Sequence, residues 1–148
     1  MTAKEQRHII EKYHSPISNI LGTDKWEFVH TEYENIYYGK FPTGCYVIKM
    51  EKEVLASFQL VQMIGCCGIL VSTQSSVHRK LRGKGLGTVL NSLRVEMARN
   101  MGYGILLCTD VESNAAQRKI LAKNGWQDIY DFKNPRTGNR VFISVINL

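Results

Sequence analysis

The chain has 148 residues, the length of one ordinary domain, and a formal net charge of +6. No stretch approaches the roughly 20 apolar residues that span a bilayer, and residues 1–7 lack the apolar run of a signal peptide, so we expect neither a membrane protein nor a secreted one. The four cysteines include no C-x-x-C pair, which argues against a zinc site and favours a reducing, cytoplasmic compartment.

Two short helices are expected at the start of the chain. Apolar residues between Ile9 and Tyr13 recur on one helical face. Ser15 can cap a second helix, with Pro16 at its first position and Gly22 just past its end.

The middle of the chain, residues 26–77, is rich in aromatic and β-branched residues, which is typical of strands. Four antiparallel strands are expected there, over residues 26–38, 45–50, 54–63 and 68–77. The breaks between them contain glycines, a Pro-Thr-Gly sequence and a charged Glu-Lys-Glu run.

After Val77 the pattern predicts a helix, a strand, a second helix and two further strands, over residues 85–100, 104–109, 113–124, 126–133 and 140–146. The turn at residues 134–139 contains proline and glycine, so the last two strands are expected to form a hairpin. The strand, helix, strand unit implies one parallel pair inside an antiparallel sheet. The sequence therefore predicts one α/β domain over residues 1–148, with a mixed sheet and helices on its faces.

Charge is placed unevenly along the chain. Residues 1–74 carry 7 basic and 8 acidic side chains, and residues 75–148 carry 12 and 5, which gives net charges of −1 and +7. A basic half indicates a phosphate-rich partner, which could be a nucleotide cofactor, a nucleic acid or an anionic surface.

A glycine-rich turn, R-G-K-G-L-G at residues 82–87, joins a predicted strand to a predicted helix. Three glycines let a ligand approach the backbone and let successive N–H groups point toward one place. The helix start adds unpaired N–H donors and about half a positive charge, so the turn is suited to a diphosphate. The other interpretation is a flexible basic loop, whereas the spacing matches neither a Rossmann dinucleotide site nor a P-loop.

This turn also carries a family resemblance. Arg82-x-x-Gly85-x-Gly87 follows a strand that ends in Val77 and precedes an amphipathic helix, and it resembles the acyl-CoA signature [QR]-x-x-G-x-[GA] of the GNAT superfamily. The order of predicted elements is similar to the GNAT order throughout. Asn114, eleven residues before Gly125, matches the second GNAT motif, in which an Asn opens a helix that ends in Gly and an aromatic residue.

The resemblance implies a GNAT-like fold with helices on both faces of the sheet and one splayed parallel pair, and it implies acetyl-CoA as the cofactor. Strands 68–77 and 104–109 would part to receive the pantetheine arm. The backbone N–H groups of residues 82–88 would hold the pyrophosphate, Val77 and Arg79 would lie along the pantetheine, and the N–H of Val77 would polarise the thioester carbonyl. The cofactor-binding residues expected are Val77, His78, Arg79, Arg82, Gly83, Lys84, Gly85, Leu86, Gly87, Thr88 and Asn114, and no metal is expected.

The catalytic groups depart from the family pattern. A Tyr that protonates the leaving thiolate commonly stands seven residues after the Asn, and here that position is Leu121. The strand before the turn offers no carboxylate, so Asp110 and Glu112, just past the next parallel strand, are the nearest candidates for the general base, with a helix-cap or loop role as the alternative. Asp110 is the one we favour, and His78 is a further alternative, although an exposed side chain or a contact with the cofactor is expected for it. Cys108 lies in an apolar run and is expected to be a buried hydrophobic residue.

The function expected is acyl-CoA-dependent N-acyltransfer, most often of acetyl, directly to an amine on a small molecule or a protein. One alternative is nucleic-acid binding or modification by the basic half, with Tyr130, Phe132, Arg136 and Arg140 available for stacking and phosphate contact. These aromatics could equally belong to the core. Another alternative is a GNAT-like module that binds CoA without turnover. No membrane partner is expected, and a homodimer is an alternative to a monomer.

Overall fold

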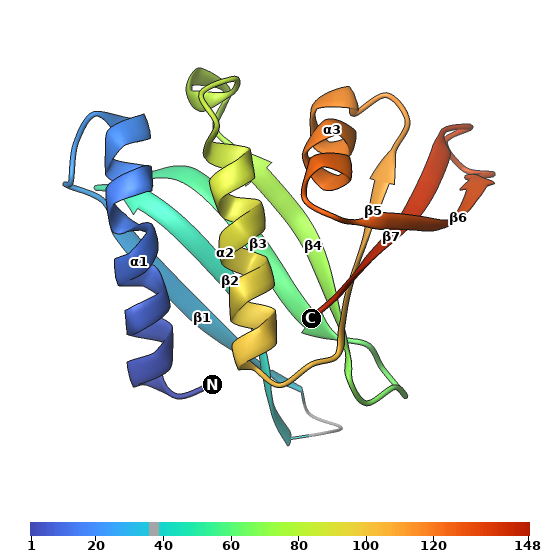
Figure 1. Ribbon diagram of the computed structural model, residues 1–148, viewed down its shortest axis with the longest axis horizontal. Coiled ribbons are helices and arrows are strands. Elements are labelled where there is room, and N and C mark those ends of the chain that lie inside the picture. Colours follow the sequence, from blue (N-terminus) through green and yellow to red (C-terminus); the bar gives the residue numbers. More distant parts are fainter. Residues whose placement is uncertain (36–38) are drawn as a thin grey trace.

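The computed structural model describes the backbone of residues 1–35 and 39–148, and the side chains of these residues outside positions 32–43. A seven-stranded sheet has the order β1-β2-β3-β4-β5-β7-β6 (Figure 1). The strands are β1 (Glu27–Asn35), β2 (Gly39–Met50), β3 (Glu53–Gln62), β4 (Ile69–Val77), β5 (Ile105–Val111), β6 (Gln127–Lys133) and β7 (Arg140–Asn147). The mixed sheet predicted from the sequence is confirmed.

The four predicted N-terminal strands are present, but their breaks differ. β2 begins at Gly39 and runs through residues 42–44, which the sequence analysis interpreted as a break. Gly39 and Lys40 pair with β1, and the register with β1 shifts between them and Gly44, where the pairing with β3 begins. Proline and glycine are tolerated at such an irregular part of a strand. The predicted end of the first strand, at residues 36–38, lies outside the described residues.

The prediction of two opening helices was wrong, because the chain forms one helix, α1 (Ala3–Leu21), with Pro16 inside it. Proline removes one backbone hydrogen bond from a helix. Ile9 and Ile17, before and after the proline, are both buried in the core, so packing of one continuous apolar face outweighs that loss. Gly22, with φ 70°, ends the helix as predicted.

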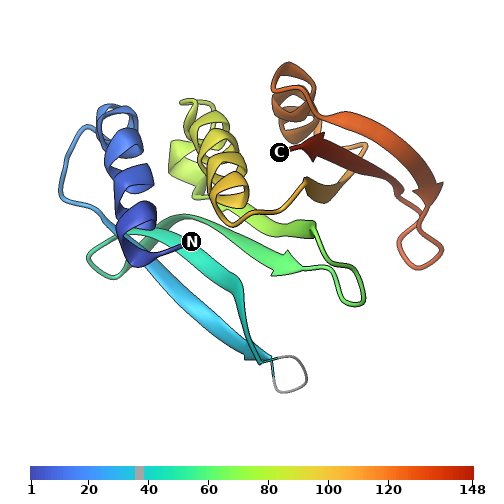
Figure 2. The same cartoon turned by 60° about the horizontal axis from the view of Figure 1, so that its bottom comes forward.

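The other helices are α2 (Leu86–Asn100) and α3 (Ala115–Lys123), and a short 3-10 turn, η1 (Arg79–Leu81), precedes α2. Figures 1 and 2 show the three helices on one side of the sheet, where we had expected helices on both faces. β5 and β6 are both antiparallel to β7, so they run in the same direction. The connections β4–α2–β5 and β5–α3–β6 therefore both join parallel strands and advance in the same direction along the sheet. When two such crossovers are right-handed, their helices lie on the same face.

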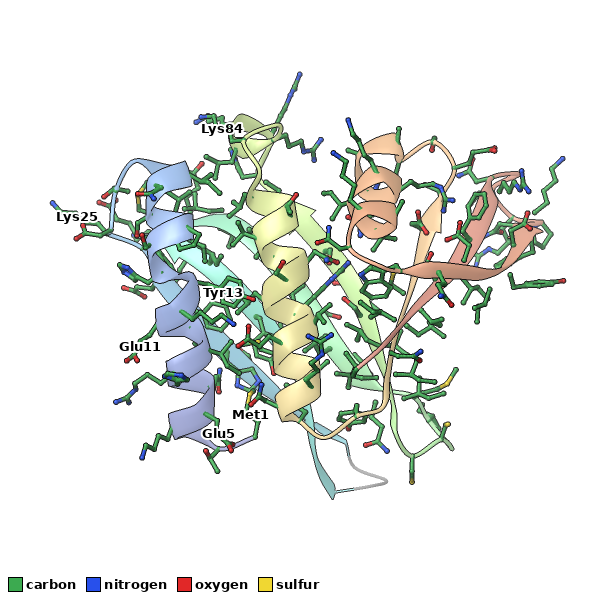
Figure 3. All side chains as sticks on the ribbon, in the orientation of Figure 1. Met1, Glu5, Glu11, Tyr13, Lys25 and Lys84 are labelled. Atoms are coloured by element: carbon green, nitrogen blue, oxygen red, sulfur yellow. The ribbon has the colours of Figure 1, made fainter. Side chains whose placement is uncertain are left out.

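Helices α1 and α2 lie side by side over β1–β4, where Tyr13 is placed between them (Figure 3). The Tyr13 hydroxyl donates a hydrogen bond of 2.8 Å to Oε2 of Glu96, and Lys12 forms an ion pair with the same oxygen. Beneath these helices the core contains large, fully buried side chains from three strands, among them Tyr46, Phe58 and Leu70. Within the described chain, none of the helices has the length and apolar character needed to cross a bilayer.

The parallel pair β4–β5 is short. Its register runs only from Ile69 opposite Ile105 to Ser72 opposite Cys108, although both strands continue beyond it. Just past this point, β4 has an irregularity in its pairing with β3, and Gln74 there has φ 50°, a conformation rare outside glycine. The two strands therefore pair at one end only, as predicted for a splayed pair.

Candidate active site

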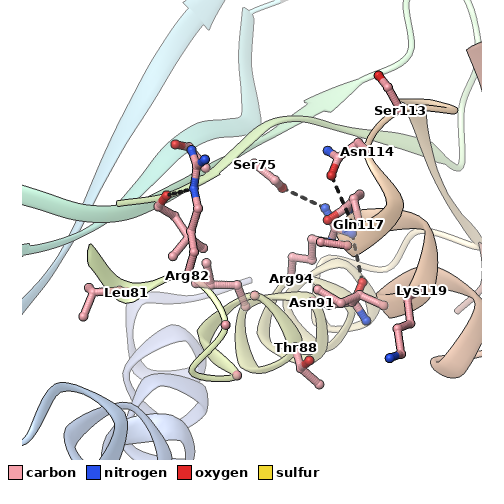
Figure 4. Close-up of a pocket in the computed structure, with 18 residues that line it drawn as sticks. Ser75, Leu81, Arg82, Thr88, Asn91, Arg94, Ser113, Asn114, Gln117 and Lys119 are labelled. Carbon is pink, nitrogen blue, oxygen red and sulfur yellow. Dashed lines mark hydrogen bonds between the residues drawn. The ribbon is translucent and has the colours of Figure 1, made fainter. Parts of the chain in front are cut away.

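A cleft of about 700 Å³ lies where β4 and β5 no longer pair, between the glycine-rich turn, α2 and the start of α3 (Figure 4). Its lining residues come from the end of β4, the turn, one side of α2 and residues 113–120. They are Ser75, Ser76, Val77, Leu81, Arg82, Gly83, Gly85, Gly87, Thr88, Leu90, Asn91, Arg94, Ser113, Asn114, Ala116, Gln117, Lys119 and Ile120.

The turn has the backbone conformation that its glycines permit. Gly83 has φ 77° and Gly85, the N-cap of α2, has φ 90°, both in the left-handed region that side chains disfavour. Gly87 has another role, because a Cβ there would lie 3.1 Å from Cδ1 of Ile120 on α3. Glycines thus shape the turn and also let α3 approach α2.

The start of α2 presents unpaired N–H groups. In the described part of the chain, no acceptor bonds to the backbone N–H groups of residues 83–87. The N–H of Thr88 donates to the Gly85 carbonyl at 3.0 Å and that of Arg82 donates to the Arg79 carbonyl at 3.4 Å. The free donors are therefore those of residues 83–87, a narrower set than the predicted 82–88, and they fit the oxygens of a diphosphate.

Arg82 ties the turn to the end of β4. Its Nε donates a hydrogen bond of 3.2 Å to the carbonyl oxygen of Val77, which Figure 4 shows as the dashed line beside Arg82. The guanidinium therefore holds the turn against the strand, and its side chain remains exposed beside the cleft.

The N–H of Val77 points toward the cleft. The N–H of the next residue, His78, donates to the Leu55 carbonyl at 2.8 Å, so this pair is hydrogen-bonded across β3 and β4. Opposite residues in an antiparallel ladder alternate between bonded and non-bonded pairs. Val77, opposite Ala56, is then in a non-bonded pair, and its N–H faces away from β3 toward the side that β5 leaves open.

Asn114 is the N-cap of α3, as predicted, and its Oδ1 accepts a hydrogen bond of 3.3 Å from the N–H of Gln117. Both residues line the cleft opposite the turn (Figure 4). The cap oxygen is thus used by the helix, whereas among the described residues no hydrogen bond is formed by the amide nitrogen of Asn114.

Four predicted cofactor-binding residues are not among those that line the cleft. Nε2 of His78 is 3.3 Å from Oε1 of Glu53, beside a separate cavity of about 160 Å³. Arg79 begins η1, so its backbone cannot continue the strand along a pantetheine arm as expected. Lys84 lies at the outer end of the turn and points into solvent (Figure 3). The Leu86 side chain is in the core, so the group that Leu86 offers to a ligand is its free backbone N–H.

Asp110 does not line the cleft. Its side chain is buried, with Oδ2 3.1 Å from Nη1 of Arg118 and Oδ1 3.4 Å from Oγ of Ser144. Arg118 and Ser144 also contact Asp128, at 2.6 and 2.7 Å. The candidate base is therefore one member of a charge network between β5, α3, β6 and β7.

Leu121, at the position of the family's Tyr, is buried on α3 and carries no proton to donate. Cys108 is buried as predicted, and burial raises the pKa of its thiol to about 12. Trp126, the aromatic residue that follows Gly125, is buried in the core. Tyr130 and Phe132 are exposed on β6, so the interpretation of these two aromatics as core residues was wrong.

Sequence reasoning missed the polar side of α2. Asn91 and Arg94 are both buried, line the cleft and are hydrogen-bonded to each other at 2.9 Å. A signal for them was present, because Arg94 follows Leu93 and stands four residues after Leu90, on the face that the apolar pattern assigns to the core. A charge on that face needs an explanation.

Comparison with known proteins agrees with this geometry. The model of the family described as "Acetyltransferase (GNAT) family" matches residues 9–126. A comparison with curated protein sequences found no match.

Several solved structures share the fold. A GNAT family acetyltransferase from Elizabethkingia anophelis with acetyl-CoA bound superposes with a TM-score of 0.66 at 14% identity, over 85% of this chain and 100% of that one. An IAA acetyltransferase from Bacillus cereus gives 0.62 at 15% identity, over 82% and 100%. An acetyltransferase from Bacillus subtilis in complex with CoA gives 0.60 at 18% identity, over 72% and 77%. At these identities the similarity establishes a common fold.

Proposed function

Because the chain belongs to the GNAT acetyltransferase family, we propose that it transfers an acetyl group from acetyl-CoA directly to an amine. The observation that carries this proposal is the set of free N–H groups of residues 83–87, which open into the cleft at the start of α2. Similar structures from Elizabethkingia anophelis and Bacillus subtilis contain acetyl-CoA and CoA.

In the proposed binding mode, residues 83–87 donate hydrogen bonds to the pyrophosphate, helped by the positive end of α2. The exposed cations Lys80, Arg82 and Lys84 attract the phosphates to the turn. The amide nitrogen of Asn114 contacts the cofactor from the α3 side. The pantetheine arm lies along the end of β4, in the space that β5 leaves.

When bound, acetyl-CoA supplies a thioester whose carbonyl carbon is open to attack by an amine. The N–H of Val77 donates to the thioester carbonyl and stabilises the negative charge that develops on its oxygen. A preorganised donor in this role is worth roughly 3 to 4 kcal/mol. This donor is a backbone group at the end of β4, so its position is set by the strand before the substrate arrives.

The general base stays a prediction. Asp110 is the buried carboxylate at the end of β5, and its contact with Arg118 gives it a structural role as well. We propose it as the group that accepts the proton of the amine, through water, since it does not line the cleft itself.

An amine on a small molecule or on a protein is the proposed acceptor, and the cytoplasm is the proposed compartment. The four cysteines are free, which is usual where thiols are kept reduced. The nucleic-acid alternative is less well supported, because Arg140 on the terminal hairpin is paired with Asp131 and lies 3.5 Å from Glu112.

Calorimetric titration with acetyl-CoA tests the binding claim. We expect saturable binding and a rise in Tm with ligand concentration. Absence of binding at millimolar acetyl-CoA would contradict the proposal. Release of free thiol with a panel of amines then separates an enzyme from a module that binds CoA without turnover.

A further inference from the structure

Arg94 is almost fully buried, with 3% of its surface exposed, and it lines the inner part of the cleft. Its Nη1 donates to Oγ of Ser75 at 2.8 Å and to Oγ of Ser72 at 3.1 Å, and its Nη2 donates to Oδ1 of Asn91 at 2.9 Å. Figure 4 shows Ser75 and Asn91 pointing toward the guanidinium. All of these hydrogen-bond partners are neutral.

The charge of Arg94 is uncompensated. Among the described residues no carboxylate forms an ion pair with it, and its Nε is buried without an acceptor. The thiol of Cys108 does not compensate the charge of Arg94, because burial raises the pKa of that thiol to about 12 and keeps it neutral. The guanidinium also faces the ring of Trp126, 5.1 Å from its centroid. A buried cation with neutral partners costs free energy that an arriving anion would recover.

The position of Arg94 matches the thiol end of the cofactor. It stands nine residues after Gly85, which is about 13 Å along the axis of α2. An extended pantetheine arm spans about 15 Å between the phosphate and the sulfur. Ser72, which Arg94 contacts, is also the last β4 residue paired with β5, so the guanidinium lies where the cleft closes.

We propose that Arg94 is a catalytic residue that stabilises the CoA thiolate as it leaves, an inference that rests on the proposed function. In the reaction, the lone pair of a neutral amine forms the new C–N bond to the acyl carbon. The C–S bond breaks and its electron pair stays on sulfur as the thiolate. The extra proton on the amide nitrogen passes to water or to a base. The guanidinium donates hydrogen bonds to the thiolate. The thiolate takes a proton from water when CoA is released.

This role fits the departure at Leu121. A leaving thiolate is stabilised either by receiving a proton or by a nearby positive charge. Leu121 cannot donate a proton. Burial lowers the pKa of the Arg94 guanidinium, but an arginine starts from a pKa so far above neutrality that Arg94 is charged near neutral pH. A cation in the cleft therefore takes over the role that a tyrosine has in the family pattern.

The test measures the thiol of bound CoA and needs no acceptor. The ultraviolet absorbance of the thiolate is followed against pH for CoA bound to the wild type, to Arg94→Met and to Arg94→Lys. We expect the bound thiol to lose its proton about one to three pH units below the thiol of free CoA in the wild type. The shift should persist in Arg94→Lys and vanish in Arg94→Met, while Arg99→Met, an exposed cation lost from the same helix, should leave it intact.

A second measurement is made on the wild type alone and compares its affinity for two ligands. The affinity of the wild type for CoA, relative to desulfo-CoA, should rise as the pH increases through the pKa of the bound thiol. No shift in the wild type, or an equal shift in Arg94→Met, would overturn the role of Arg94. Failure of the wild type to bind acetyl-CoA at all would instead overturn the proposed function, so the two failures are distinguishable.

Discussion

A Cβ atom at Gly87 would lie 3.1 Å from Cδ1 of Ile120, so α2 and α3 are close to contact at the cleft. We expect Gly87→Ala to change the free energy of unfolding by less than about 1 kcal/mol, because alanine favours the helix and the end of the Ile120 side chain can shift. Acetyl-CoA affinity should fall about tenfold, or 1.4 kcal/mol, because the methyl group narrows the cleft.

Calorimetry on Gly87→Ala and on the double variant with Ile120→Val checks this prediction. If the methyl group meets the ligand, the loss of affinity persists in the double variant. If it acts by displacing α3, removal of Cδ1 restores the affinity. Unchanged affinity in Gly87→Ala would show that the cofactor does not approach this helix start.

Gly85→Asp is expected to abolish acetyl-CoA binding. The side chain would project from the N-cap of α2, and its negative charge would stand where the pyrophosphate is proposed to lie. Gly22→Asp is the matched control, because Gly22 also has a positive φ and open space around it but lies at the end of α1, outside the cleft. Both variants should lose about 1–2 kcal/mol of stability from the left-handed backbone, and only Gly85→Asp should lose the ligand. Retained affinity would show that the turn is misassigned.

The turn and its helix were predictable because their signals are local. Glycines, a helix start and an apolar repeat act within a few residues of one another, so residues 82–100 have the expected structure. The position of α3 followed from equally local signals, with Asn114 as its cap. The strand, helix, strand order around α2 then implied the parallel pair β4–β5.

Side-chain directions were less predictable because they depend on distant partners. His78 turns away from the cleft toward Glu53 on β3, and Asp110 meets Arg118 on α3. Locally, Pro16 indicates the start of a helix. The helix continues through it because residues on both sides of the proline pack into the core, and this packing is not visible in the local sequence. The sequence shows that Arg94 is a charged residue on the apolar face of its helix. Only the fold shows that this face borders a cleft.

The variant Asp110→Asn distinguishes a structural role of the buried carboxylate from a catalytic one, because stability, acetyl-CoA affinity and turnover can be measured separately. We expect acetyl-CoA affinity to stay within about twofold of the wild type, a loss below 1 kcal/mol, because Asp110 does not line the cleft. The free energy of unfolding should fall by about 1–3 kcal/mol, because a charged hydrogen bond to Arg118 is weakened. Urea unfolding and calorimetry measure these two quantities.

Turnover then decides whether Asp110 is the base. Asp128→Asn perturbs the same Arg118 contacts from the outer side of the network and is the matched control. A fall in thiol release of about a hundredfold or more in Asp110→Asn alone would assign it as the base. Equal, small losses in both variants would remove Asp110 from the chemistry.

Asp128 makes stability depend on pH in the acid range. The Arg118 guanidinium, 2.6 Å away, and the Ser144 hydroxyl, 2.7 Å away, hold the pKa of Asp128 below its usual range. A carboxyl group with a lowered pKa in the folded state contributes stability above its unfolded pKa of about 3.9, and this contribution is lost as the pH falls through the folded pKa. The wild type should therefore exceed Asp128→Asn in stability at neutral pH.

Urea unfolding at pH 7 and near pH 3 tests the sign of this effect. We expect the stability difference between wild type and Asp128→Asn to shrink at the lower pH, because the wild-type carboxylate is then becoming protonated and resembles the amide. Glu11→Gln, on the exposed face of α1, controls for the loss of one negative charge and should show a smaller change. A difference that grew on acidification would mean that Arg118 and Ser144 do not stabilise the charged form of Asp128.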